Sequence, residues 1–132
     1  MSHEIQWLTL TVGLTLLFWI PYVLNRIAVR GLWGTLDNPS AISTPLSPWA
    51  ERARAAHTNA VENLVAFAPA ALAVHAMNLG NATTDLACAL YFYARLAHFV
   101  VYSAGIPVLR TLAFFGGWVG TAILVARLAG WS

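Results

Sequence analysis

The sequence predicts an all-α integral membrane protein in which four transmembrane helices form one bundle. Hydrophobic residues make up 59% of the 132-residue chain and charged residues only 9%, well below the roughly 25% of charged residues in soluble domains. Four long apolar stretches, uncharged apart from Arg95, cover residues 5–24, 63–84, 86–109 and 111–126. A hydrocarbon core about 30 Å thick needs ~20 helical residues. Four spans therefore occupy residues 1–132 as a single domain.

The first helix is expected over residues 3–30. It ends in Pro21, Arg26 and Arg30 rather than in a small-residue cleavage site, so we expect a retained span and not a removed signal peptide. A loop rich in Gly, Pro and Ser follows over residues 31–48 and contains several helix breakers.

The second helix is expected over residues 48–77. Ser47 is suited to the N-cap and Pro48 to the first helical position, and we expect a kink at Pro69. A short turn over residues 78–83 leads to the third helix.

The third helix is expected over residues 84–104, with Thr84 as its N-cap. Gly105 and Pro107 end it, and the fourth helix follows over residues 108–129.

All seven basic residues are arginines, and their positions predict the orientation in the membrane. Most of them border the first and third loops; these are Arg26, Arg30, Arg52, Arg54 and Arg110. By the positive-inside rule, these two loops face the cytoplasm, and Arg127 is the one exception. Because the arginines lie at helix ends and inside spans rather than in one basic stripe, we expect no nucleic-acid binding.

Polar side chains recur at helical spacing on the second and third helices. On the second helix they are Arg54, Thr58 and Glu62 at i, i+4 and i+8, with Asn59 three residues before the glutamate. On the third helix they are Tyr91, Arg95, His98 and Tyr102 at i, i+4, i+7 and i+11. Residues at such spacings share roughly one helix face. Arg110 begins the fourth helix near the same end, so the set is expected to converge in the cytoplasmic third of the membrane.

One intramembrane carboxylate, Glu62, stands among these cations. Pairing with Arg54 or Arg95 would lock helix packing, and for any single residue we weigh this role equally with ligand binding. One carboxylate cannot neutralise all of the arginines in the set, which are Arg52, Arg54, Arg95 and Arg110. The excess charge predicts an anion from outside. A small peptide-like anion with two carboxylates suits arginines, and Arg110 would hold a thiol on it as the thiolate.

A metal site is the weaker alternative. His57 and His98 with Glu62 could supply ligands for zinc or iron, but the neighbouring arginines repel a dication. No His-x-x-x-His or Glu-x-x-His pair lies on one helix face. Cys88 is the only cysteine, which excludes an internal disulfide and a thiolate cluster. We therefore expect no metal.

Two motifs in register also resemble a known family. Residues 52–63 read Arg-Ala-x-x-Ala-His-x-Asn-x-x-Glu-Asn, and residues 95–102 read Arg-x-x-His-x-x-x-Tyr, followed by the arginine that begins the fourth helix. This pattern, with the four-span length and the Asn-Pro of the first loop, is similar to the MAPEG proteins, membrane-associated proteins in eicosanoid and glutathione metabolism. The compact length and short turns resemble the bacterial branch.

The resemblance implies a homotrimer that binds glutathione between neighbouring subunits near the cytoplasmic face. It assigns to the glutathione site Asn59, Glu62, Arg95, His98 and Tyr102, with Arg110 as the residue that stabilises the thiolate and Thr111 beside it. It also implies a first-helix arginine, and the spacing to Asn38-Pro39 favours Arg30 over Arg26. Because Ala55 stands where several mammalian members have an arginine, Arg52 or Arg54 would supply that charge.

The resulting hypothesis is a membrane-bound glutathione transferase of a bacterial inner membrane, with its active site toward the cytoplasm. Its second substrate would be a lipophilic electrophile, and glutathione peroxidase activity toward lipid hydroperoxides is a further option. Phe114 stands where the prostaglandin synthase of the family has a tyrosine, and the interval from Tyr102 to Arg110 is one residue shorter, so an eicosanoid substrate is not assigned.

Two rival hypotheses remain open at this point. A non-catalytic scaffold that binds lipid or glutathione would use the same polar set without turnover. A small transporter would use the polar stripe as an ion path.

Overall fold

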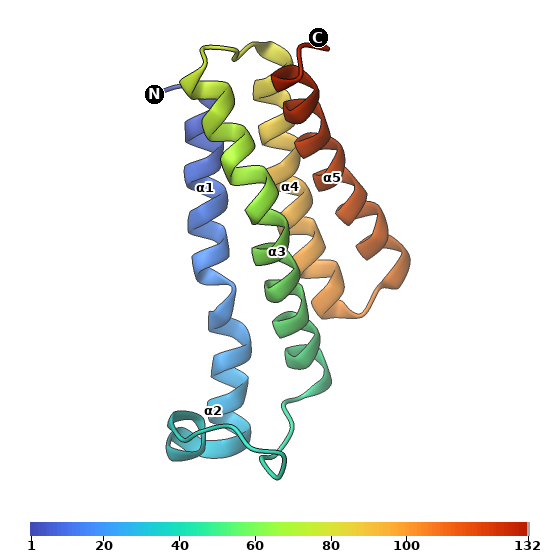
Figure 1. Ribbon diagram of the computed structural model, residues 1–132. Helices are drawn as coiled ribbons and strands as arrows, with labels where there is room; N and C mark the ends of the chain where they lie inside the picture. Colours follow the sequence, from blue (N-terminus) through green and yellow to red (C-terminus); the bar gives the residue numbers. More distant parts are fainter. Residues whose placement is uncertain (132) are drawn as a thin grey trace.

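A computed structural model describes residues 1–131, and every regular element in that part of the chain is helical. The elements are α1 (His3–Leu17), α2 (Trp19–Leu36), α3 (Pro48–Ala76), α4 (Ala82–Ala104) and α5 (Pro107–Leu128). Figure 1 shows α1 and α2 as one broken rod beside α3, with α4 and α5 behind and to the side. The all-α prediction is confirmed.

The first predicted helix is broken at Phe18, so the prediction of one continuous helix over residues 3–30 is wrong. α1 ends at Leu17 and α2 begins at Trp19. Pro21 gives the physical reason: it has no N–H for the carbonyl four residues earlier, and its ring crowds that carbonyl. Regular helix then continues to Arg30, as expected. Gly31 has φ 73° and ψ 171°, and a further short helical piece extends α2 to Leu36.

The N-termini of α3 and α4 differ in how they are capped. Ser47 is the N-cap of α3, as predicted, although its side chain makes no capping bond. The side chain of Glu51 folds back instead, and its Oε1 accepts a hydrogen bond from the Leu46 N–H at 3.1 Å. α4 begins two residues earlier than expected because Asn81, and not Thr84, is its N-cap. Thr84 is the other half of a reciprocal capping box.

Helices α4 and α5 form the closest antiparallel pair, and glycines make their approach possible. Gly117 and Gly120 on α5 are buried. A Cβ built at Gly120 would lie 2.7 Å from the Ala87 carbonyl oxygen of α4. Small residues that let two backbones approach are typical of helix contacts in membranes. This contact fixes where the N-terminus of α5, with its arginine, lies against α4.

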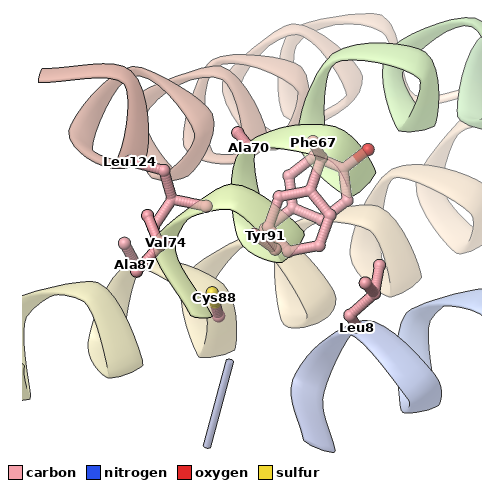
Figure 2. Close-up of a cluster of buried hydrophobic side chains, with 9 residues drawn as sticks. Leu8, Phe67, Ala70, Val74, Ala87, Cys88, Tyr91 and Leu124 are labelled. Carbon is pink, nitrogen blue, oxygen red and sulfur yellow. The ribbon is translucent and has the colours of Figure 1, made fainter. Parts of the chain in front are cut away.

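The core lies where α1, α3, α4 and α5 meet (Figure 2). Phe67 of α3 and Tyr91 of α4 stack with ring centroids 3.8 Å apart and an interplanar angle of 2°. Val74 and Leu124 are fully buried beside them, and Cys88 is buried as the small core residue that its surroundings predict. The core therefore occupies the half of the bundle nearer the termini.

Within the described residues, three helical segments are long and apolar enough to cross a membrane: His3–Leu36, Ala82–Ala104 and Pro107–Leu128. α3 is not among them, because its first half carries the polar set. The membrane prediction is supported, whereas the count of four spans and the homotrimer remain predictions. The 34-residue segment His3–Leu36 is about 50 Å long at 1.5 Å per residue, so it extends past a hydrocarbon core of about 30 Å.

Candidate functional site

A polar pocket lies on the exposed side of α3, away from the core. Its volume is about 500 Å³, and it is lined by Glu51, Arg54, Ala55, Thr58, Asn59, Glu62 and Tyr102. The helical spacing of the α3 residues puts them on one face, opposite the alanines and Phe67 that pack inward. The structure thus brings together four of the predicted site residues, Arg54, Asn59, Glu62 and Tyr102.

Arg95 and His98 lie behind this pocket rather than in its wall. Both side chains are 2% exposed. Arg95 Nη2 donates to Asn59 Oδ1 at 2.7 Å and lies 3.3 Å from His98 Nδ1. Arg95 Nε is buried and has no hydrogen-bond partner among the described residues. A buried guanidinium held by an amide oxygen fixes the orientation of that amide, so Arg95 positions Asn59 in this chain.

Asn59 is held from a second side by its own helix. Asn63 Nδ2 donates to the Asn59 carbonyl oxygen at 2.8 Å and to Asn59 Oδ1 at 3.2 Å. Two donors, one from Asn63 and one from Arg95, therefore meet the same side-chain oxygen. The amide nitrogen of Asn59 is the group left to face the pocket.

Arg110 of α5 contacts one residue of the pocket wall, Tyr102. Its guanidinium carbon lies 4.6 Å from the centroid of the Tyr102 ring, a cation–π contact. Tyr102 in turn meets the His98 ring edge-to-face, with centroids 5.5 Å apart. Thr111, the next residue, is exposed, and its hydroxyl donates to the Pro107 carbonyl at 3.2 Å. The start of α5 therefore brings an arginine against Tyr102, a residue of the pocket wall, and leaves the Thr111 hydroxyl bonded to its own helix.

Two other arginines of the predicted set point elsewhere in this chain. Arg30 Nε donates to the Thr44 carbonyl of the first loop at 2.6 Å. Arg52 Nε donates to the Ser103 carbonyl at 3.0 Å, and its guanidinium packs on Gly105 at the end of α4. Arg30 does not line the pocket. Of the two candidates to replace the charge missing at Ala55, the structure places Arg54 in the pocket wall.

Among the described residues, the carboxylates that line the pocket, Glu51 and Glu62, form no ion pair with Arg54 or Arg110. A contact of 2.9 Å joins His3 Nδ1 and Asp85 Oδ2, an ion pair when the histidine is protonated. His3 begins α1 and Asp85 lies in the first turn of α4, at the end of the bundle where Figure 1 shows both termini. Glu62 makes no ion pair with Arg54 or Arg95, so the locking role considered for it is absent among the described residues. The pocket keeps both an available carboxylate and available guanidinium groups.

Two features near the site were not predicted from the sequence. The first is that Glu51 lines the pocket. Its spacing of eleven residues from Glu62 puts the two side chains on one helix face, so this feature could have been predicted. The second feature is a contact of 2.8 Å between the Tyr22 hydroxyl and His57 Nδ1, which joins α2 to α3. No sequence pattern links these two residues, which are 35 positions apart.

Comparison with known proteins bears on this arrangement. The model of the MAPEG family matches residues 5–130, almost the whole chain. The chain belongs to the MAPEG family. No curated protein and no solved structure matches it significantly. MAPEG proteins include glutathione transferases and related proteins, and also members without catalytic activity.

Membership of the MAPEG family confirms the resemblance seen in the two motifs. The match extends over the helices that carry those motifs and over the arginine at the start of α5. The described residues contain no group of three or more His, Cys, Asp or Glu side chains placed to hold a metal ion. The groups that the pocket offers to a ligand are guanidinium, amide, carboxylate, hydroxyl and phenol.

Proposed function

We propose that this MAPEG protein is a membrane-bound glutathione transferase that activates glutathione as the thiolate for attack on lipophilic electrophiles. The observation that carries the proposal is a pocket with the Arg54 guanidinium in its wall, next to Tyr102, whose ring contacts the Arg110 guanidinium, and no carboxylate paired with either arginine among the described residues. Guanidinium groups without an ion-pair partner are available to an anionic group of a ligand, and arginine binds carboxylates in bidentate geometry.

The remaining pocket groups match the other parts of the tripeptide. Glutathione carries two carboxylates, one ammonium group, two amides and a thiol. Glu62 can accept from the ammonium group, and Asn59, oriented by Arg95, can donate to a carbonyl oxygen. A volume of about 500 Å³ lies within the range of roughly 300–1,000 Å³ that is usual for small-molecule sites. The hydrogen-bonding groups of the pocket and its volume therefore support glutathione as the ligand.

Arg110 is the residue proposed to activate the sulfur. A guanidinium beside a thiol lowers its pKa from about 8.5 and so raises the thiolate fraction at neutral pH. When bound, glutathione supplies the nucleophilic sulfur, and the protein supplies the field that keeps it ionised. The Arg110 guanidinium lies over the Tyr102 ring, and that ring contacts the His98 ring edge-to-face. Thr111 would join the site by turning its hydroxyl away from the Pro107 carbonyl.

The assembly is proposed to be a homotrimer, which would cover the polar face of α3. Arg54, Thr58 and Glu62 are exposed in the single chain, and charged groups facing hydrocarbon are costly. A neighbouring copy would shield them and could bring its own Arg30 to the pocket. The lipophilic electrophile, or a lipid hydroperoxide in a peroxidase reaction, would reach the thiolate from the bilayer. We place the site on the cytoplasmic side of a bacterial inner membrane, where the positive-inside rule puts the α2–α3 and α4–α5 loops.

Calorimetry can separate an enzyme from a glutathione-binding scaffold. Wild-type protein in detergent is titrated at neutral pH with glutathione and with S-methylglutathione, in two buffers of different ionisation enthalpy. We expect glutathione binding to release a proton, because the thiol ionises on binding, and S-methylglutathione to release none. Binding without proton release, together with no conjugation across a panel of lipophilic electrophiles and hydroperoxides, would favour the scaffold. Absence of glutathione binding would refute both.

A further inference from the structure

Arg52 begins the polar motif of α3, yet it does not line the proposed glutathione pocket. Its guanidinium reaches α4 instead, where Nε donates to the Ser103 carbonyl oxygen at 3.0 Å. Ser103 lies in the last turn of α4, 51 positions further along the chain. The bond therefore joins the N-terminal part of α3 to the end of the helix that carries Tyr102.

The carbonyl that Arg52 contacts is one of those that a helix cannot satisfy by itself. The last four carbonyl groups of a helix have no partner within it. At the C-terminus of α4, the Gly105 N–H donates to the Tyr102 carbonyl at 3.0 Å, and the Ser103 carbonyl receives its hydrogen bond from Arg52 of α3. The helix dipole also favours a positive charge at this end. Arg52 is thus a C-terminal cap supplied by a neighbouring helix.

Gly105 leaves the space that this cap occupies. Its φ of 80° lies in the left-handed region that favours glycine at the end of a helix. A Cβ built at Gly105 would lie 3.3 Å from both Cζ and Nε of Arg52, so the guanidinium packs where a side chain would otherwise be. The turn and the arginine therefore stabilise each other in one geometry.

Tyr102 and Arg110 lie on the two sides of this turn. Tyr102 belongs to the last turn of α4, and Arg110 to the first turn of α5, where its N–H donates to the Ile106 carbonyl at 3.1 Å. Pro107 begins α5 and restricts the backbone between them. The 4.6 Å contact between the Arg110 guanidinium and the Tyr102 ring thus depends on the backbone of the turn, and Arg52 is bonded to that backbone.

We propose that Arg52 is a positioning residue of the transferase: it caps α4 from α3 and so holds the α4–α5 turn in the geometry that places Arg110 beside the sulfur of glutathione. The inference rests on the proposed function, and Arg52 itself does not touch the ligand. The Arg95–Asn59 bond also joins α3 to α4. With these two bonds, the part of the site on α3 and the part on the turn keep a fixed separation.

Arg52→Met tests this role, with Arg127→Met as the matched control. Arg127 Nε donates to the Leu79 carbonyl at 2.8 Å, a bond of the same kind at the turn between α3 and α4. Binding of S-methylglutathione and the thiolate absorbance of bound glutathione across pH are measured in detergent. We expect Arg52→Met to lower the ionisation constant of the bound thiol by about tenfold or more and to keep the Kd of S-methylglutathione within about twofold. Arg127→Met should leave both quantities unchanged.

Two further measurements make the test specific. In the Arg110→Ala background, Arg52→Met should cause no further change in thiol ionisation, because Arg52 acts through Arg110. Hydrogen exchange of the Gly105 amide, followed by NMR without glutathione, should be about tenfold faster in Arg52→Met than in wild type. Arg52→Lys keeps the charge and a donor but lacks the planar guanidinium. It should give intermediate values in every measurement, and it serves as the test variant if Arg52→Met does not fold.

Three results would overturn the inference. Equal effects of Arg52→Met and Arg127→Met on thiol ionisation would show a general loss of stability. Weaker binding of S-methylglutathione with unchanged ionisation would show that Arg52 contacts the ligand. Unchanged exchange at Gly105 would show that Arg52 does not hold the turn. A wild-type protein that does not bind glutathione would instead refute the proposed function, and the exchange experiment would still decide whether Arg52 holds the turn.

Discussion

Arg95 Nη2 donates a 2.7 Å hydrogen bond to Asn59 Oδ1 across the α3–α4 contact. This bond ties the helix that carries most of the pocket to the helix that carries Tyr102. Arg95 is a buried cation, 2% exposed, and through this bond it orients the Asn59 side chain at the pocket surface. The two motifs found in the sequence are thus joined by one interaction, with Arg95 behind the pocket and Asn59 in its wall.

The Arg95–Asn59 bond predicts a measurable coupling. Asn59→Ala leaves a buried guanidinium short of an acceptor, so we expect a loss of ~1–3 kcal/mol in the free energy of unfolding. In the double variant Asn59→Ala/Arg95→Met, the loss should be smaller than the sum of the single losses, with a coupling of about 1 kcal/mol, near the values found for polar pairs within membranes. Unfolding in mixed micelles gives all four free energies. Additive losses would contradict the supporting role of Arg95.

Arg110→Ala should affect thiolate formation more than glutathione binding. Without the guanidinium, the pKa of the bound thiol rises toward its free value, so the thiolate fraction at neutral pH falls. We expect turnover of a generic electrophile at neutral pH to drop by about 10²-fold, the scale seen when one charge-stabilising donor is removed, and to recover as pH increases. Thiolate absorbance and conjugation rate, followed across pH, check both statements.

Arg110→Lys is the matched control for that experiment. Lysine keeps the positive charge and a weaker contact with the Tyr102 ring, but lacks the planar guanidinium. Its turnover should lie between those of wild type and Arg110→Ala. Unchanged turnover in Arg110→Ala would show that Arg110 does not stabilise the thiolate. Glutathione binding by the other pocket residues would then still be tested by calorimetry.

Tyr91→Phe should leave stability unchanged or raise it. The Tyr91 ring is stacked on Phe67 in the core, but its buried hydroxyl has no hydrogen-bond partner among the described residues. Removing an unpaired polar atom relieves a desolvation cost and keeps the ring stack, so we expect a gain of up to ~1 kcal/mol. Phe67→Ala, in contrast, should cost ~3–5 kcal/mol through the cavity it leaves. Tyr93→Phe, at a side chain 59% exposed, serves as the control with no expected change.

Gly120→Ala tests the close approach of α4 and α5. The added Cβ would lie 2.7 Å from the Ala87 carbonyl oxygen, a backbone atom that cannot move aside cheaply. We expect a loss of ~1–3 kcal/mol from overpacking and a displaced α5, which would lower activity through Arg110. Gly13→Ala in α1 is the control, because nothing lies within 4 Å of its Cβ. That substitution should stabilise the protein by roughly 0.5–1 kcal/mol. Equal effects at the two glycines would be inconsistent with the α4–α5 contact described.

The sequence predicted most of the secondary structure because apolar length and breakers are local properties. The loop before Pro48, the break at Gly105 and the start of the last helix near Pro107 all follow from residues beside them. The break at Phe18 was missed although Pro21 signals it, because a proline in a membrane helix is often accommodated without a break. The cap of α4 was misplaced by three residues, since Asn81 and Thr84 are both good caps and only the backbone decides between them.

The sequence by itself determined that this chain is an all-helical membrane protein of the MAPEG family and which polar residues form its unusual set. Helical periodicity placed Arg54, Asn59 and Glu62 on one face, because that relation depends only on spacing along one helix. Tertiary structure alone decided which residues line the pocket and which support it from behind. Arg95 and Glu62 look alike as charged residues inside apolar helices, yet one is buried against Asn59 and the other is exposed. Burial and partner choice depend on how α3, α4 and α5 pack, and that packing is set by contacts between residues far apart in the sequence.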